Sequence, residues 1–253
     1  MTPSTSTPSP GADRPAGGPI SRLSPRDALL VLIDVQNDFC HPRGTMGRRG
    51  MDLSAVPPAV ANAELLLAAA RGAGVPPLFV RTVHGEGVDS DAWRHRYAAG
   101  IGTGERPAPG NCLEGSWGAE FYRLRPRPGE SVAVKHRYSA FGSPGFRAAL
   151  AAHGRPALVL AGVTTNVCVE STLRSAVDAD HLASVVSDAC AAYDAAEHAA
   201  AVTVMARHFG RSFTTADVVA HWRREKPATP ETRATSETPE TRKARREEVR
   251  RDG

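Results

Sequence analysis

The sequence lacks the features that place a chain in a membrane or export it. No apolar run in its 253 residues approaches the roughly 20 residues that a membrane-spanning helix requires. Its first residues, MTPSTSTPSPGADRPAGGPI, have neither the basic start nor the apolar core of a secretory signal. We therefore expect a soluble, cytoplasmic protein that does not bind membranes.

The sequence is also poor in cysteine. Its four cysteines are Cys40, Cys112, Cys168 and Cys190, and they form neither a CxxC pair nor a metal-ligand spacing. Disulfides are rare in the cytoplasm, so each cysteine is expected to be a free thiol.

The two ends of the chain differ in composition from its middle. Residues 1–20 are rich in Pro, Ser, Thr and Gly and bury too little apolar surface to offset the cost of ordering, so they are predicted to be a disordered leader. Residues 223–253 contain 10 Lys and Arg, 7 Asp and Glu and no aromatic residue, which predicts a charged, disordered tail. The tail supplies most of the net charge of +4, so the basic balance does not indicate nucleic-acid binding, and we expect none.

The middle of the chain, residues 21–222, is long enough for one domain with a sizeable core. Short apolar runs predict strands that are covered on both faces. These runs lie at residues 28–34, 77–83, 131–136, 157–163 and 182–189, with a sixth near 212–214. Segments with helical spacing follow at residues 55–71, 144–153, 166–178, 195–208 and 216–222. The alternation predicts an α/β fold with a parallel sheet between helices, interrupted by a long connection at residues 84–130.

Three reactive side chains are expected at one end of this sheet. Ligands of open parallel sheets bind outside the carboxyl ends of the strands. Asp34 ends the first predicted strand, Lys135 ends the third, and Cys168 begins the helix after the fourth. Each alone has an ordinary structural explanation, as a turn residue, a solvated cation or a small buried side chain. Together they supply a proton acceptor, a cation and a nucleophile.

Three segments also carry a resemblance to a known family. In this order, ALLVLIDVQNDF, VKHRYSAF and AGVTTNVCVESTLR resemble the signature segments of the isochorismatase-like cysteine hydrolases. The resemblance extends over nearly all of residues 27–222. It implies a three-layer αβα sandwich with a six-stranded, mostly parallel sheet, and hydrolysis of a small molecule by a triad. In this sequence the triad is Asp34, Lys135 and Cys168.

The chemistry of thiols explains why such residues would lie together. A free thiol has a pKa of about 8.5 and is mostly protonated at neutral pH, whereas attack requires the thiolate. A helix beginning near Asn166, the Lys135 cation and Asp34 as proton acceptor are expected to activate Cys168. Backbone N–H groups of Thr164 and Cys168 are expected to bind the oxyanion, and the resemblance implies a cis peptide bond before Thr164. Water activated by Asp34 would then cleave the thioester.

Departures from individual subfamilies favour one type of reaction. True isochorismatases cleave a vinyl ether and usually have glycine at the nucleophile position, so Cys168 favours amide-type hydrolysis. Nicotinamidases bind a divalent metal through a DxH pair and a later histidine. Here RTVHGEG gives His84 without that aspartate, although His95 follows. We expect neither a metal nor another cofactor. A non-catalytic binding module, or a subunit whose tail recruits a partner, is the remaining alternative.

The segments HRYSAF, TNVCVESTLR and LEGSWGAEF resemble ureidoacrylate and N-carbamoyl amidohydrolases in particular. A ureido carbonyl can accept the thiolate while the ureido N–H groups bond to Asp34 or Asn166. Aromatic and polar side chains are candidates for the rest of the pocket, with the arginines suited to a carboxylate. The substrate-binding candidates are Phe39, Trp93, Trp117, Tyr138, Phe141, Asn166, Arg94 and Arg96.

Two further expectations concern support of the site. Gln36 and Asp38, which belong to the first signature segment, are expected to brace the site rather than react. The resemblance also implies a homo-oligomer, a dimer or a tetramer, in which a neighbouring subunit could complete the pocket near residues 84–130.

Overall fold

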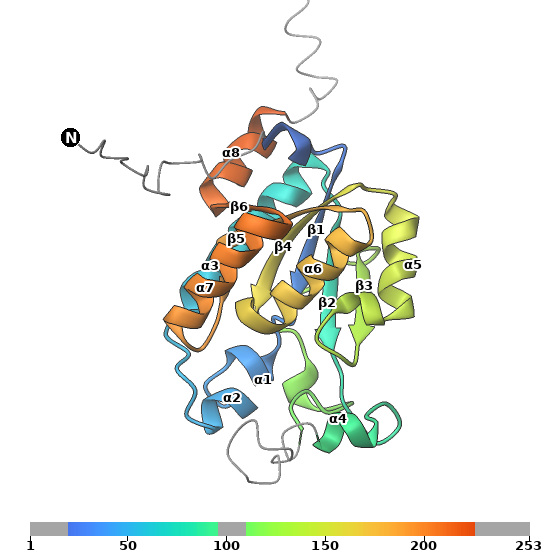
Figure 1. The fold of residues 1–253 in the computed structure, drawn as a ribbon, viewed down its shortest axis with the longest axis vertical. Coiled ribbons are helices and arrows are strands. Elements are labelled where there is room, and N and C mark those ends of the chain that lie inside the picture. The colour runs from blue at the N-terminus through green and yellow to red at the C-terminus, as the bar shows by residue number, and fades with distance from the viewer. Residues whose placement is uncertain (1–19, 96–109, 226–253) are drawn as a thin grey trace, which may run out of the picture.

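The computed structural model describes residues 20–95 and 110–225. Within them, six strands form one sheet in the order β3-β2-β1-β4-β5-β6, and each neighbouring pair is parallel. The strands are β1 (Ala28–Ile33), β2 (Pro77–Thr82), β3 (Ser131–Lys135), β4 (Ala157–Val163), β5 (Leu182–Ala191) and β6 (Arg211–Phe213). The arrowheads of β2, β3 and β4 point toward the short helices α1, α2 and α4 at the lower end of Figure 1.

Helices cover both faces of the sheet, which confirms the predicted three-layer αβα sandwich (Figure 1). Helices α3 and α8 pack on one face with the turn η1, and α5, α6 and α7 pack on the other. The helices are α1 (Asn37–Cys40), α2 (Thr45–Arg48), α3 (Val56–Ala73), α4 (Asp91–His95), α5 (Pro144–His153), α6 (Glu170–Asp178), α7 (Ala195–Val204) and α8 (Thr215–Arg224). Shorter helical turns are η1 (Ile20–Leu23), η2 (Trp117–Ala119), η3 (Ala140–Gly142), η4 (Thr165–Val169) and η5 (Met205–Phe209).

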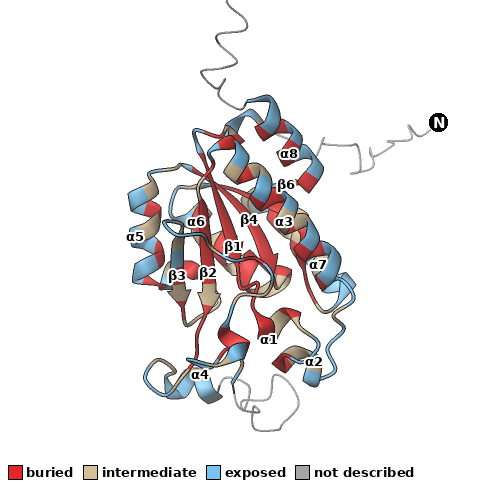
Figure 2. Ribbon diagram, turned by 180° about the vertical axis from the view of Figure 1, so that it is seen from behind, coloured by how far each residue is buried: buried red, intermediate tan, exposed pale blue. Residues whose placement is uncertain are grey.

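The central strand β1 shows why the sheet strands are continuous apolar runs. Every residue of β1 is buried. Leu30 and Leu32 belong to the core beneath α3 and α8, whereas Leu29, Val31 and Ile33 belong to the core beneath α5 and α6. A strand covered on both faces has no polar side to expose. Figure 2 shows this central part of the sheet as buried.

The long connection after β2 folds back against the carboxyl ends of the strands. Isolated bridges join Gln36 to Phe121 and His84 to Leu113. The described residues of this connection thus lie beside the segment that follows β1, where the sequence predicts the site.

Asp38 ties the loop to the rest of this end of the sheet. Its carboxylate accepts hydrogen bonds from the backbone N–H and hydroxyl of Thr45, at 2.8 and 2.9 Å, and from the N–H of Cys112 at 2.7 Å. A Cβ on Gly118 would lie 2.1 Å from the same carboxylate, so only glycine fits there. Asp38 is therefore a brace between three segments, as its place in the first signature segment predicts.

The described structure begins and ends near the two ends of the predicted domain, residues 21–222. The turn η1 begins at Ile20, and α8 continues through Arg224, past the predicted end at Trp222. Residues 1–19 and 226–253, which hold nearly all of the predicted leader and tail, are outside the described residues.

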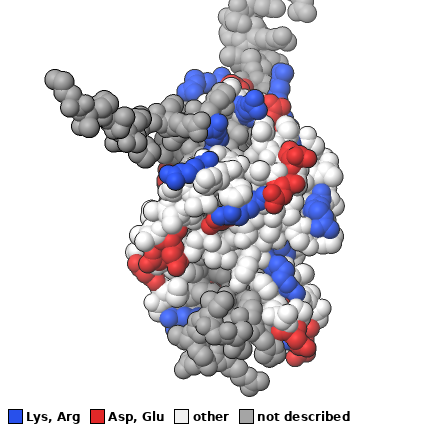
Figure 3. All heavy atoms as spheres, in the orientation of Figure 1, with Lys and Arg blue, Asp and Glu red and all other residues white. Residues whose placement is uncertain are grey.

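The surface over α5, α6 and α7 carries basic and acidic side chains interspersed (Figure 3). On α6, for example, Arg174 pairs with Glu170 at 2.6 Å. In the described part of the chain, no helix is both long and apolar enough to cross a lipid bilayer.

Candidate active site

Asp34 occupies an unusual backbone position at the end of β1. Its φ is 52°, in the left-handed region that residues other than glycine seldom adopt. Its N–H donates to Val80 O at 2.9 Å, and its side chain is completely buried. Such conformations cost about 1–3 kcal/mol and cluster at functional sites. This backbone turn places a carboxylate inside the protein, at the carboxyl edge of the sheet.

Lys135 brings its ammonium group to this carboxylate. It ends β3 and is also buried, with Nζ 2.6 Å from Asp34 Oδ2. Nζ further donates to Thr82 Oγ1 at 2.6 Å and to Arg137 O at 3.0 Å. The fourth contact is with the candidate nucleophile, because Nζ donates to Cys168 Sγ at 3.4 Å. A single cation thus touches both other members of the predicted triad.

Cys168 reaches this point through a close approach of β4 to β1. Gly162 has a φ of 131°, and a Cβ there would lie 2.0 Å from Ile33 O, so no side chain fits between the strands. The next peptide bond, Val163–Thr164, is cis, as the family resemblance implies. The chain then enters the π-helical turn η4, which carries Cys168 and leads directly into α6.

The environment of Cys168 differs from the expected one. Burial raises the pKa of the Cys168 thiol well above its ordinary value, the charge of Asp34 raises it further, and Lys135 only partly offsets both. Burial lowers the pKa of Lys135, but the charge of Asp34 works against burial, and the pKa is raised overall. The resting site is therefore an Asp34–Lys135 ion pair beside a protonated thiol, rather than a preformed thiolate.

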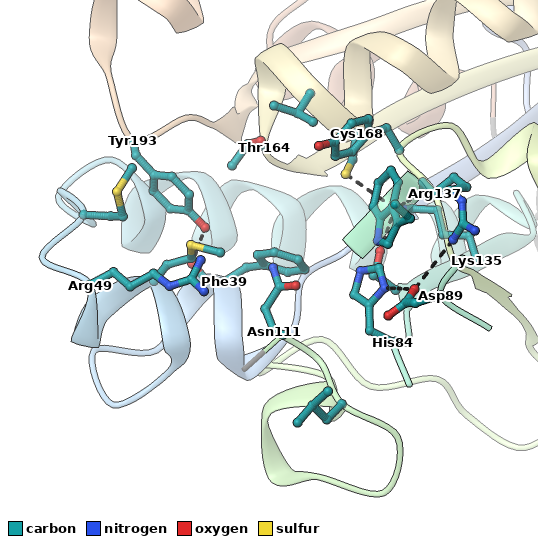
Figure 4. A pocket seen from close by; sticks show the side chains of 18 of the residues that line it. Phe39, Arg49, His84, Asp89, Asn111, Lys135, Arg137, Thr164, Cys168 and Tyr193 are labelled. Atoms are coloured by element: carbon teal, nitrogen blue, oxygen red, sulfur yellow. Dashed lines mark hydrogen bonds and ion pairs between the residues drawn. The ribbon is translucent and has the colours of Figure 1, made fainter. Parts of the chain in front are cut away.

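A cavity of about 940 Å³ opens onto these residues. In Figure 4, Phe39, Arg49 and Tyr193 lie on one side of it, and His84, Asp89, Lys135 and Arg137 on the other, with Thr164 and Cys168 between. Tyr193 donates from its hydroxyl to Phe39 O at 3.0 Å, which holds one wall together. The cavity lies outside the carboxyl ends of the strands, where the fold predicts a ligand.

The structure brings some of the predicted substrate-binding residues to the cavity and leaves others elsewhere. The predicted residues that line it are Phe39, Trp93, Arg94, Tyr138 and Asn166, together with the oxyanion candidate Thr164. Trp117 does not line it; the residue is 42% exposed, and its ring packs edge-on against His41. Phe141 does not line it either; its partly buried ring packs edge-on against Phe146 at the margin of the core. Arg96 lies outside the described residues.

One wall contains a group of charged and aromatic side chains that the sequence did not single out as a unit. Trp93 stacks on His84, with ring centroids 5.7 Å apart, and the Arg137 guanidinium lies 4.8 Å from the centre of the Trp93 ring. His84 Nδ1 is 2.9 Å from Asp89 Oδ1, and Tyr138 packs 4.9 Å from Trp93. In the sequence, the only indication of this group is the position of Arg137, two residues after the end of β3.

His84, the histidine of the RTVHGEG segment, pairs with Asp89. In residues 20–95 and 110–225, no group of three or more His, Cys, Asp or Glu side chains is arranged to hold a metal ion. The side chain of His95 is outside the described part of the chain.

The turn that carries Cys168 is fastened to α7 by two side-chain bonds that the sequence did not predict. Thr165 Oγ1 is 2.8 Å from Nδ1 of His198, and Asn166 donates to Glu197 at 2.6 Å. These contacts tie η4 to α7. Asn166 and Glu197 also line the cavity, so they connect the turn to the space for a ligand.

Comparison with known proteins agrees with this geometry. Residues 28–217 match the isochorismatase domain family. Ureidoacrylate amidohydrolase RutB from Pseudomonas syringae pv. syringae is 35% identical over 189 residues, which cover 71% of this chain and 77% of that protein.

Two solved structures share the fold, each at about a quarter of identical residues. A cysteine hydrolase from Pseudomonas syringae pv. phaseolicola superimposes with a TM-score of 0.68 at 26% identity, covering 79% of this chain and 94% of that one. For N-carbamoylsarcosine amidase from Thermoplasma acidophilum, the TM-score is 0.59 at 25% identity, with 75% and 96% covered. By its matched domain, its relatives and its fold, the chain belongs to the isochorismatase-like cysteine hydrolase family.

Proposed function

We propose that this protein hydrolyses the carbon–nitrogen bond of a small ureido or carbamoyl compound, with Cys168 as nucleophile. One observation carries the proposal: at the cavity, Lys135 Nζ contacts both the Asp34 carboxylate, at 2.6 Å, and Cys168 Sγ, at 3.4 Å. The names of the relatives, a ureidoacrylate amidohydrolase and an N-carbamoylsarcosine amidase, support the choice of bond.

The first step is transfer of the thiol proton to Asp34. Because burial raises the pKa of Cys168, a free thiolate is scarce at neutral pH and a base must take the thiol proton before the sulfur attacks. Asp34 becomes neutral in this step while the sulfur becomes negative. Lys135 contacts both groups, so its positive charge is balanced before and after the transfer.

The sulfur then adds to the ureido carbonyl. A new S–C bond forms and the carbonyl π electrons move to oxygen, which gives a tetrahedral oxyanion. Backbone N–H groups of Thr164 and Cys168 are proposed to bind this oxygen, since preorganised donors stabilise such charge most effectively. The side-chain oxygen of Asn166 is a suitable acceptor for a ureido N–H at the same place.

Collapse of the intermediate breaks the C–N bond. The leaving nitrogen takes the proton from Asp34 and departs as an amine, which leaves a carbamoyl group on sulfur as a thioester. Water then gives a proton to Asp34 and attacks the thioester, and the proton returns to Cys168 as carbamate leaves. Asp34 thus acts as base and acid in turn, and the enzyme is regenerated.

The cavity supplies cations for an acidic substrate. Arg49, Arg94 and Arg137 line it. Four acidic residues, Glu86, Asp89, Asp194 and Glu197, line it too, so a carboxylate would be bound by an individual arginine and not by a net positive charge. An arginine binds a carboxylate through two parallel hydrogen bonds. A substrate with a carboxylate at the end remote from the ureido group is therefore the first choice.

A substrate panel tests the proposal. The purified protein is assayed with ureidoacrylate, N-carbamoyl amino acids, biuret, nicotinamide and isochorismate, and ammonia or product is measured. We expect turnover of a ureido or carbamoyl acid and none by the Cys168→Ala variant. Turnover of isochorismate alone, or turnover that survives in Cys168→Ala, would contradict the proposal.

A further inference from the structure

The side chain of Thr82 lies between the two charged members of the site. Thr82 ends β2, the strand between β1 and β3, and it is in register with Lys135. Its hydroxyl oxygen is 3.0 Å from Asp34 Oδ1 and 2.6 Å from Lys135 Nζ. The residue is 4% exposed, so these contacts are shielded from water.

The chemistry of the partners fixes the direction of both hydrogen bonds. An ammonium group only donates, so the Thr82 oxygen accepts from Lys135. A hydroxyl has one proton, and an ionised carboxylate only accepts, so this proton goes to Asp34 Oδ1. The two contacts therefore cannot exchange roles without breaking one of them.

This arrangement makes the two oxygens of the Asp34 carboxylate unequal. Oδ1 is occupied by the Thr82 proton. Oδ2 has its ion pair with Lys135 but accepts no hydrogen bond of normal geometry from the described residues. Each carboxylate oxygen has two acceptor sites, and neither site of Oδ2 is taken by such a hydrogen bond, so Oδ2 has the greater capacity for an incoming proton.

Thr82 is itself held in place through its backbone. Gln36, which is completely buried, donates to Thr82 O at 2.8 Å and accepts from Thr82 N at 2.8 Å. The same amide donates to Ala119 O at 2.8 Å, which anchors it to η2. The backbone N–H and C=O of Thr82 are thus both paired with the Gln36 side chain, which fixes the backbone from which the hydroxyl projects.

We propose that Thr82 is a positioning residue, whose hydroxyl holds the Asp34 carboxylate so that Oδ2 receives the proton of the Cys168 thiol. The inference rests on the proposed function for its role in turnover. The underlying proton transfer also governs reaction of Cys168 with a simple alkylating agent, so it is testable without any substrate.

The experiment compares Thr82→Val, which keeps the shape but lacks the hydroxyl, with Thr82→Ser, which keeps the hydroxyl. The rate of iodoacetamide labelling of Cys168 is followed by peptide mass spectrometry as a function of pH. A misplaced catalytic group typically costs about 100-fold. We expect Thr82→Val to label about 10- to 100-fold more slowly than the wild type near pH 7, with Thr82→Ser close to the wild type. The rates should approach each other as pH rises, because hydroxide increasingly takes the place of Asp34 as the base.

Thr215→Val is the matched control for stability. Thr215 is also buried, and its hydroxyl likewise donates to an aspartate, Asp188, at 2.8 Å, but it lies at the start of α8 and away from the cavity. It should lose stability as Thr82→Val does, with unchanged labelling of Cys168. If Thr82→Val does not fold, Thr82→Ala takes its place.

Several results would overturn the proposal. The first is a labelling rate of Cys168 in Thr82→Val that equals that of the wild type at every pH. The second is a rate reduced by the same factor at every pH, and the third is a Thr82→Ser variant that labels as slowly as Thr82→Val. With an active substrate, kcat should fall about 100-fold in Thr82→Val while KM stays nearly constant. If no ureido or carbamoyl compound is turned over but the labelling pattern appears, the proposed function fails and the role of Thr82 stands.

Discussion

Replacing Lys135 with methionine removes the ammonium group and keeps most of the volume of the side chain. The change leaves the fully buried carboxylate of Asp34 without its cation. Breaking a buried ion pair in this way costs about 3–5 kcal/mol of the free energy of unfolding. A domain of this size is stable by about 5–15 kcal/mol, so we expect a folded but weakened variant. Loss of one group that stabilises developing negative charge costs about 10²- to 10³-fold in turnover.

A double variant separates these two effects. Asp34→Asn combined with Lys135→Met replaces the ion pair with a neutral pair of similar size. We expect its free energy of unfolding, measured by urea denaturation, to lie well above that of Lys135→Met, whereas turnover stays undetectable because the proton acceptor is gone. The reasoning would be refuted by a Lys135→Met variant that keeps more than about a tenth of wild-type turnover. It would also be refuted by a double variant as unstable as the single one.

Three further outcomes follow from the same structure. The pKa of Lys135 is raised above its ordinary value of 10.5, so its contribution to stability is complete below that pH and is lost as pH rises through the raised value. The free energies of unfolding of wild type and Lys135→Met, measured by urea denaturation, should therefore converge only above about pH 10.5. Prolonged treatment with a chelator should leave turnover unchanged, and a loss that zinc, iron or manganese restores would favour the metal-dependent nicotinamidase alternative. Gly162→Ala should prevent folding or reduce the melting temperature by several degrees, because a Cβ would lie 2.0 Å from Ile33 O, and an unchanged melting temperature would show that β4 can move away from β1.

The fold and the reactive centre can be predicted from the sequence because both depend on short apolar runs and on the residues that end or follow them. Strands that are buried on both faces must be apolar throughout, and the structure confirms all six predicted runs, with β6 at residues 211–213. Asp34, Lys135 and Cys168 follow or end such runs, so a parallel sheet brings them to one edge whatever the loops do. The cis bond before Thr164 was implied by family resemblance alone.

Other features of the site depend on how loops and side chains turn in space. Thr82 lies inside an apolar run and is indistinguishable there from a core threonine until β1 and β3 are seen on either side of it. Trp117 and Phe141 belong to segments that carry the family resemblance, yet neither lines the cavity. The raised pKa of Cys168 results from burial, which sequence position does not reveal.

A covalent intermediate on Cys168 is the central claim, and acid quenching during steady-state turnover tests it most directly. The protein is mixed with an N-carbamoyl or ureido substrate that it turns over, quenched within milliseconds to seconds, digested and analysed by mass spectrometry. We predict a carbamoyl adduct on the peptide that contains Cys168, appearing before product and absent from Cys168→Ala. An adduct confined to Cys40, Cys112 or Cys190, or undiminished turnover by Cys168→Ala, would contradict the account.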